Sequence, residues 1–291
     1  MNRNVVIFGG AGVVGSFISK IYKSNGYSVQ SVDKNGSTEL GHITQDCLEI
    51  VDKRPELLDW ASILIFTLPE DVASNCLRAV APRIKPGKHG LINTCSAQHE
   101  FHDLANSLCF GCESVGVNPM FSPTLDCESR PMVVCENTST SLGRNIEEIL
   151  VREKMNVIRL TPTEHDEMMS LCQGLPHALI LAFLFNIPAD QEKLASLLAV
   201  APPPMQTLMC LAARIAKNDP SIYWGIQKNN RATLHVLSHI QESIEELRRW
   251  VQDDAEHEFR AEILGRKNEL ESTVNQYAEK CADIFSFLNN R

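Results

Sequence analysis

The sequence has little of what marks an exported or membrane-inserted protein. Its first residues, MNRNVVIFGG, hold an apolar run that ends in glycines instead of a small-residue cleavage site, so they do not resemble a signal peptide. No run approaches the roughly 18 uncharged apolar residues of a membrane helix. Internal repeats and low-complexity linkers are also missing. These absences predict a cytoplasmic protein with no membrane partner.

An excess of basic residues is lacking as well. The chain has 27 Lys and Arg against 36 Asp and Glu, which gives a net charge of -9. This balance argues against nucleic acid as a general partner. With 291 residues, 44% of them hydrophobic, the chain is long enough for one large domain or two ordinary ones.

The ten cysteines show no regular spacing, and without a secretory signal we expect reduced thiols. One cluster, His99, His102, Cys109 and Cys112, has the residue types of a zinc site. The gap between its histidines and cysteines is short for a zinc finger, and no second pair follows. We therefore expect no metal here, but a surface helix over HEFHDLANSL followed by buried thiols.

The N-terminal segment has the order of a dinucleotide-binding unit. The apolar strand Asn4 to Phe8 is followed by glycines in the pattern G-x-G-x-x-G, by a helical pattern, and by a second strand that ends at Asp33. In this pattern the first glycine allows a tight turn, the second lets a pyrophosphate approach, and the third lets helix and strand pack closely. The free N–H groups at the start of the helix would face the phosphates. The predicted cofactor-binding residues of this segment are Gly10, Gly12, Val13, Val14, Gly15 and Asp33.

A carboxylate at Asp33 accepts hydrogen bonds from ribose hydroxyls and repels a 2′-phosphate, so NAD is favoured over NADP. Lys34, directly after it, weakens that preference slightly.

Further apolar runs predict more strands in SILIFTLP, HGLINTCS, ESVGVNP, RPMVVCE and MNVIRL. Ligands of parallel sheets bind beyond the carboxyl ends of the strands. This rule places a second set of residues on the same rim as the glycine loop: Thr67, Leu68, Pro69, Ser96 and Asn118.

The second half of the chain has helical periodicity only. We predict a Rossmann-type α/β nucleotide-binding domain over residues 1–160 and an all-α domain for substrate binding and dimerisation over 161–291. Thr161 and Glu164 form a helix-capping signal, and Pro176 is expected to kink the long apolar helix that follows. Two further long helices are expected, from SIYWGIQ to RRWVQ and from EFRAEIL to IFSFL.

Polar groups within these apolar helices are candidate site residues. His165 and His177 are spaced to share a helix face if the helix is continuous. Arg214 lies on an otherwise apolar face, where it would bind either a substrate anion or a carboxylate of the protein itself.

The motifs GGAGVVG, NTCS, NPMFSP, TPTEHDEMM…LPHAL and ARIAKNDPSIY resemble, in order and spacing, those of the prephenate/arogenate (cyclohexadienyl) dehydrogenase family. The resemblance implies NAD(P)-dependent oxidation and decarboxylation of a cyclohexadiene, and a homodimer formed through the helical domain. It implies catalytic roles for Ser96 and His177 and a substrate carboxylate on Arg214. Further implied substrate contacts are His165, Gln173 and Ser122, with Asp166 supporting the pocket.

Asn118 is the main departure from the family pattern, which has H-P-M-F-G-P where this chain has NPMFSP. An amide is no general base near neutral pH. Asn93 likewise replaces a family aspartate. Three interpretations stay open: a prephenate dehydrogenase that is slow or uses another base, an inactive NAD-binding sensor, or an enzyme for a 4-amino substrate. We favour the third, because an amine lone pair expels hydride without a base and Asn118 would only accept an N–H hydrogen bond.

Overall fold

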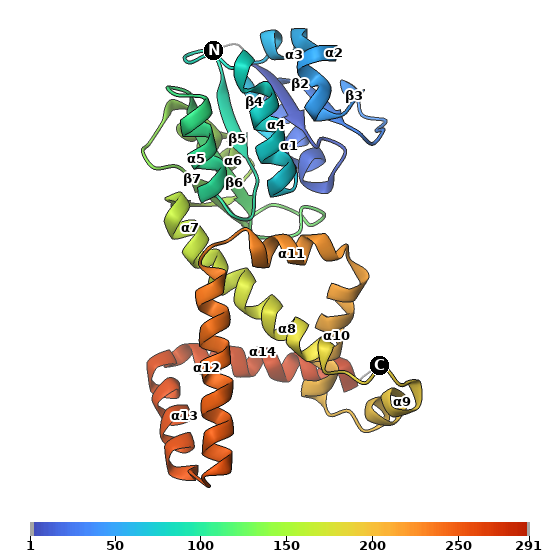
Figure 1. Ribbon diagram of the computed structural model, residues 1–291, viewed down its shortest axis with the longest axis vertical. Helices are drawn as coiled ribbons and strands as arrows, with labels where there is room; N and C mark the ends of the chain where they lie inside the picture. Colours follow the sequence, from blue (N-terminus) through green and yellow to red (C-terminus); the bar gives the residue numbers. More distant parts are fainter. Residues whose placement is uncertain (1–2, 290–291) are drawn as a thin grey trace. The chain divides into compact units, whose positions relative to one another are not determined.

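A computed structural model describes residues 3–289 of the chain, which divides into two compact units, residues 1–169 and 170–291 (Figure 1). We call them the N-terminal and the C-terminal unit. The division comes after Met169 instead of after residue 160, because helix α7 (Pro162–Met169) makes its contacts with the sheet unit. The Rossmann-type fold and the helical second half are confirmed.

The N-terminal unit holds one eight-stranded sheet in the order β3-β2-β1-β4-β5-β6-β7-β8. All neighbouring strands are parallel except β6 and β7, which are antiparallel. The strands are β1 (Asn4–Phe8), β2 (Ser28–Asp33), β3 (His42–Thr44), β4 (Ile63–Phe66), β5 (Gly90–Asn93), β6 (Glu113–Pro119), β7 (Pro131–Cys135) and β8 (Asn156–Leu160). The predicted strands are confirmed. The three-residue β3 and the antiparallel pairing were not predicted.

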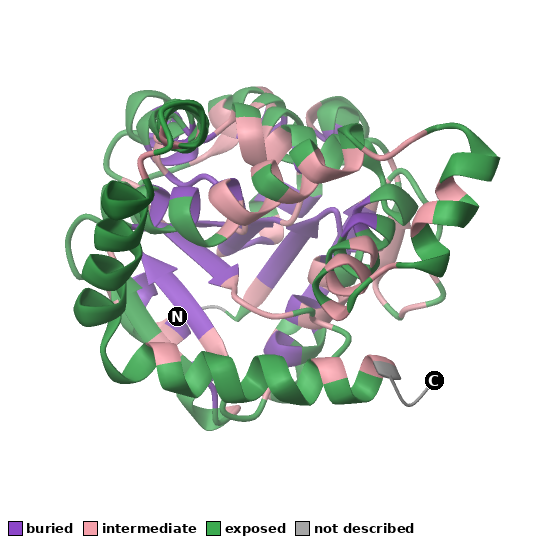
Figure 2. Cartoon of the chain, turned by 90° about the horizontal axis from the view of Figure 1, so that it is seen from below, coloured by how far each residue is buried: buried purple, intermediate pink, exposed green. Residues whose placement is uncertain are grey.

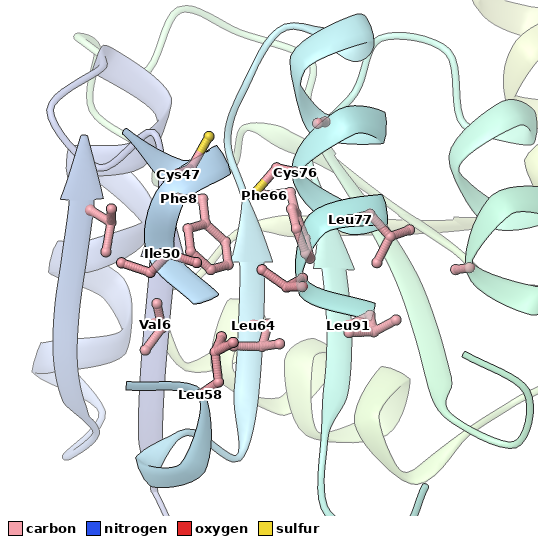
Figure 3. Packing of buried hydrophobic residues seen from close by; sticks show 14 of the residues in the cluster. Val6, Phe8, Cys47, Ile50, Leu58, Leu64, Phe66, Cys76, Leu77 and Leu91 are labelled. Carbon is pink, nitrogen blue, oxygen red and sulfur yellow. The ribbon is translucent and has the colours of Figure 1, made fainter. Parts of the chain in front are cut away.

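Both faces of the sheet are covered by helices, which is why its central strands are apolar throughout. Along β1, Val6 and Phe8 pack against one face, where Figure 3 shows them with residues of the helices above. Val5 and Ile7 pack against the other face. Figure 2 shows the buried residues gathered in the strands.

The first face carries η1 (Cys47–Glu49), α2 (Ile50–Lys53), α3 (Pro55–Trp60), α4 (Glu70–Val80), η2 (Ala81–Arg83) and α5 (His99–Leu108). The second carries α1 (Val13–Ser24) and α6 (Ser141–Arg152). Helix α5 was expected on the surface, but Phe101, His102 and Leu104 are buried, so one side of it belongs to the core.

The C-terminal unit is helical, as predicted. Its elements are a π turn (Ser170–Gly174), α8 (Leu175–Phe185), α9 (Gln191–Ala199), α10 (Pro203–Lys217), α11 (Pro220–Lys228), α12 (Thr233–Gln252), α13 (Glu256–Leu270) and α14 (Ser272–Asn289).

Two details of that prediction, both concerning helix breaks, were wrong. The first expected long helix is broken between α11 and α12, where Asn230 accepts from the N–H of Ala232 through its side chain. The second is broken at Glu271, which has a φ of 44°. Pro176 lies in the first turn of α8, and the irregularity is the π turn before it.

The capping signal is confirmed. The Thr161 hydroxyl and N–H both donate to Glu164 at 2.8 Å, and the N–H of Glu164 donates back to the hydroxyl.

Within the described residues, one helical stretch, Pro162–Phe185, is long and apolar enough to cross a membrane by length and composition alone. The sequence-based expectation that no segment comes near this limit was therefore wrong. Residues 168–185 contain no Asp, Glu, Lys or Arg, and only scattered Ser, Gln and His interrupt the apolar pattern. Of its most apolar window, 22% is buried within the chain.

Candidate active site

The glycine loop joins the end of β1 to α1. The residue with left-handed backbone is Gly9, with a φ of 85°, and not Gly10 as the motif predicted. Gly10 is needed for another reason, since a Cβ there would lie 2.3 Å from the Cβ of Ser31 on β2. A Cβ on Gly15 would lie 2.3 Å from the carbonyl oxygen of Gly9. The predicted close packing of helix and strand at Gly15 is thus present.

Gly12 differs from these glycines in facing open space. A Cβ there would have one neighbour, the carbonyl oxygen of Gly9 at 3.3 Å. Gly12 is the N-cap of α1 and offers no side-chain cap, so the first N–H groups of the helix, at Val13 and Val14, have no intrahelical acceptor. The first turn contains no acidic residue. This end of α1 also borders a groove of about 1080 Å³. The loop therefore fits an anionic phosphate group.

Asp33 stands at the carboxyl end of β2, beside this loop. Its Oδ2 accepts from the N–H of Ala11 at 3.1 Å, and its Oδ1 accepts from the N–H of Asn35 at 2.9 Å. The carboxylate is thereby fixed at the loop, where a ribose would approach.

The neighbouring strands deliver their polar residues to the same edge. The hydroxyl of Thr67, after β4, donates to the carbonyl oxygens of Phe8 at 2.9 Å and Gly9 at 3.1 Å. Leu68 is half-buried against the core, and Pro69 caps α4. The N–H of Ser96 donates to Glu70 Oε1 at 2.8 Å. Glu70 holds the loop after β5 in place.

Asn118, near the end of β6, belongs to a buried polar chain. Its Nδ2 lies 2.9 Å from Nε2 of His165, and Nδ1 of His165 lies 2.9 Å from Oδ1 of Asp166. Asp166 in turn accepts from the backbone N–H groups of Gln98 at 2.7 Å and His99 at 3.0 Å, at the start of α5. His165 is fully buried and Asn118 is 6% exposed. This set, which we call the amide relay, links β6, α7 and α5.

Asn93, the other departure from the family pattern, is also fully buried. Its Oδ1 accepts from the N–H of Cys95 at 3.0 Å, which shapes the turn that leads to Ser96. Its Nδ2 has no hydrogen-bond partner within residues 3–289.

In the C-terminal unit, His177 packs its ring edge-on against Tyr223, with ring centroids 5.2 Å apart. Burial, and then the charge of Arg214, lower the pKa of His177. Its Nδ1 is buried and has no partner within the described part of the chain. Gln173 lies in the π turn, partly buried. His165 lies on α7 in the N-terminal unit and His177 on α8 in the C-terminal unit, with the π turn between them in sequence.

Arg214 is exposed on α10, although the apolar helix face around it would suggest burial. Across residues 3–289 it has no hydrogen bond or ion pair to a protein carboxylate. The alternative of an internal ion pair is thereby excluded for the described chain, which leaves the guanidinium available to an external anion.

Known proteins share this architecture. Residues 161–265 match the family model described as prephenate dehydrogenase, dimerization domain. The 4-amino-4-deoxyprephenate dehydrogenase of Streptomyces pristinaespiralis is 26% identical over 98% of this chain and 97% of its own length. A probable arogenate/prephenate dehydrogenase of Methanocaldococcus jannaschii is 22% identical over 79% of the chain, and the chain spans 52% of that protein. The T-protein of Enterobacter agglomerans is 24% identical, and the chain spans 59% of it.

Solved structures agree on the fold. Arogenate dehydrogenase of Synechocystis has a TM-score of 0.69 at 16% identity and covers 94% of this chain and 99% of its own. Prephenate dehydrogenase of A. aeolicus, crystallised with hydroxyphenyl propionate and NAD+, has a TM-score of 0.65 at 17% identity, covering 92% and 98%. The chain is thus similar to members of the prephenate dehydrogenase family along nearly its full length, and its helical half matches the family model.

The region matched by the family model also includes part of the site described above. The family model named for dimerisation begins at residue 161, so α7 with His165 and Asp166 falls within it. In this chain, however, α7 lies in the N-terminal unit and supports Asn118.

Two other predicted groups lie apart from the amide relay. The hydroxyl of Ser122 is exposed and pairs with the hydroxyl of Thr124 at 2.8 Å. The four side chains weighed as a zinc site are not gathered into any metal-binding group within residues 3–289. His99 pairs with Asp103 at 3.3 Å instead.

Sequence reasoning missed Glu70 and Gln98. Glu70 directly follows Pro69 at the start of α4. Its position on the rim could therefore have been predicted from the end of the preceding strand. Gln98 has no comparable signal, because its part in the relay is a backbone N–H.

Proposed function

We propose that this chain is an NAD-dependent dehydrogenase that converts 4-amino-4-deoxyprephenate to 4-aminophenylpyruvate, CO2 and NADH. The observation that carries this proposal is the buried amide of Asn118 at the position where the family motif has a histidine, held 2.9 Å from His165. The name of the Streptomyces pristinaespiralis relative, which matches nearly the full length of the chain, supports the same substrate.

The chemistry is consistent with an amide in place of a base. Hydride leaves C4 while the nitrogen lone pair forms a C=N bond. The C1–carboxylate bond then breaks as CO2, and its electron pair returns to the ring and restores the amine. Both amine hydrogens are retained, so the reaction balances without a proton acceptor. Asn118 Oδ1 has only to accept one N–H hydrogen bond.

The N-terminal unit has the residues to hold the cofactor. Gly12 and the start of α1 would take the pyrophosphate, Asp33 the ribose, and Thr67, Leu68, Pro69 and Ser96 the rim around the nicotinamide. When bound, NAD+ supplies the hydride acceptor.

The C-terminal unit supplies groups for the rest of the substrate. We assign a substrate carboxylate to Arg214, whose charge no protein carboxylate neutralises within the described residues. His177 and Gln173 of this unit are proposed to contact the substrate, as is His165 of the N-terminal unit. The many exposed apolar side chains of α12 to α14, such as Ile244, Val251 and Ile263, fit a homodimer formed through this unit.

The second candidate is prephenate or arogenate, with a hydroxyl at C4. The names of the Methanocaldococcus jannaschii relative and of other family members favour it. So does the imidazole of His165, which lies one hydrogen bond behind Asn118.

The decisive test compares both substrates on the wild type and on Asn118→His, with NADH absorbance as the readout. We expect the wild type to prefer the amino substrate. Asn118→His restores a base, so kcat/KM on prephenate rises, by at most about 10²–10⁴-fold, while the rate on the amino substrate stays flat or falls. Asn118→Leu is the matched control and should give no gain on prephenate. A wild type that strongly prefers prephenate would refute the proposal.

A further inference from the structure

The amide relay has one direction of hydrogen bonding, and Asp166 sets it. Its carboxylate accepts from two N–H groups at the start of α5, a place where the helix dipole also favours a negative charge. An ionised carboxylate accepts and never donates. The Nδ1 of His165, 2.9 Å away, must therefore carry the proton of that contact.

For a neutral ring, this fixes the other side. A neutral imidazole with its proton on Nδ1 has a lone pair on Nε2 and can only accept there. The partner at 2.9 Å must then be a donor, which is the Nδ2 group of Asn118. If the amide turned over, its Oδ1 would face the lone pair on Nε2 of His165, and two acceptors would meet. The observed orientation of the amide is therefore the favourable one.

The remaining end of the amide is its carbonyl oxygen. Within residues 3–289, Oδ1 of Asn118 accepts no hydrogen bond, and it is not among the fully enclosed unpaired atoms. It is therefore open to a donor from outside the protein.

We propose that His165 and Asp166 are positioning residues that lock the Asn118 amide with Oδ1 toward the substrate, so that the site selects a hydrogen-bond donor at C4. The proposal rests on the function proposed above. With the amide reversed, Nδ2 would meet the N–H groups of the amine, and the hydrogen bond to the substrate would be lost. The relay thus requires a group at the reacting carbon that can donate a hydrogen bond, which an amine and a hydroxyl both can.

Two substitutions of His165 separate positioning from mere packing. Gln reaches the position of Nε2 with an oxygen that can accept from Asn118, whereas Asn reaches only the position of Nδ1. We expect His165→Asn to lower kcat on the amino substrate by about 3–10-fold, the value of one hydrogen bond, while His165→Gln keeps most of the rate. The Kd for NAD+ should change little in either variant, whereas the Tm should fall in both, because each leaves a buried partner of His165 without its hydrogen bond.

A double-mutant cycle gives the sharper readout. If His165 acts through Asn118, then His165→Asn should have no further effect on kcat/KM once Asn118 is Leu. An equal loss in the Asn118→Leu background would show that His165 acts independently of the amide, and would overturn the proposal.

A measurement without substrate keeps this inference separate from the proposed function. In 15N-histidine-labelled enzyme, the resonances absent from His165→Gln belong to His165. We expect them to show a neutral ring protonated on Nδ1. A proton on Nε2 would overturn the positioning role even in an active enzyme. Turnover of neither substrate would instead refute the proposed function, and the tautomer would still decide the direction of the relay.

Discussion

Substituting Gly15 and Gly12 separately distinguishes the packing of the glycine loop from its binding of a cofactor. An alanine Cβ at Gly15 would lie 2.3 Å from the Gly9 carbonyl oxygen and 2.8 Å from both Gly10 Cα and Thr67 Oγ1. The first two neighbours are backbone atoms. The third, the Thr67 hydroxyl, is hydrogen-bonded to the backbone of the same loop, so the loop itself must move. Overpacking of this kind costs about 1–3 kcal/mol. For a unit of this size, the Tm of Gly15→Ala should fall by about 2–10 °C.

Gly12→Ala is the matched control. Its only close neighbour would be the Gly9 carbonyl oxygen at 3.3 Å, and its φ of -71° and ψ of 165° suit any residue. We expect its Tm to stay near that of the wild type. The added methyl group would nevertheless keep a pyrophosphate off the first N–H groups of α1. Losing one charge-assisted hydrogen bond costs about 1.5–3 kcal/mol, so the Kd for NAD+ should rise about 10–100-fold.

Calorimetry of unfolding and of NAD+ binding on the two variants completes the test. Unchanged NAD+ affinity in Gly12→Ala would mean that the phosphates do not approach at Gly12. A stable Gly15→Ala would contradict the close packing described above.

Three further predictions concern single side chains. Asp33→Ser should narrow the preference for NAD+ over NADP+, because the carboxylate that repels a 2′-phosphate is gone; a wild type that prefers NADP+ in calorimetric titration would rule out this role. Arg214→Ala should raise KM strongly at nearly unchanged NAD+ affinity, and an unchanged KM would remove Arg214 from the site. Burial lowers the pKa of His102 to about 4 from an unfolded value near 6.5. The unfolded chain therefore binds this proton first, and stability should fall by about 3 kcal/mol as the pH drops from about 6.5 to 4, a loss that urea titrations should find reduced in His102→Leu.

The sequence was sufficient for the elements whose signal is local. The strand before Gly9, the helix after Gly12 and the acidic end of β2 all follow from apolar runs, glycines and a fixed spacing. The parallel order of β1, β4, β5 and β6 then brings Thr67, Ser96 and Asn118 to one edge.

The features that the sequence did not predict depend on tertiary structure. The antiparallel turn from β6 to β7 has no marker that separates it from another parallel crossover. The breaks before α12 and at Glu271 interrupt helices whose apolar period continues across them. The exposure of Arg214 could not be predicted from the sequence. An apolar helix face predicts that the face is covered, but it does not show whether the same chain or another molecule covers it.

The contact of Asn118 with His165 joins positions 47 residues apart and explains why the unit boundary differs from the composition change. The helical texture begins at Thr161, yet α7 completes the sheet unit, since Asp166 supplies the acceptors for the N–H groups of Gln98 and His99. An N-terminal unit ended at residue 160 would leave these N–H groups and the Asn118 amide without partners in the interior, at a cost of about 1–3 kcal/mol each. The segment that the family assigns to dimerisation is therefore also what determines how the amide is oriented at the proposed reacting carbon.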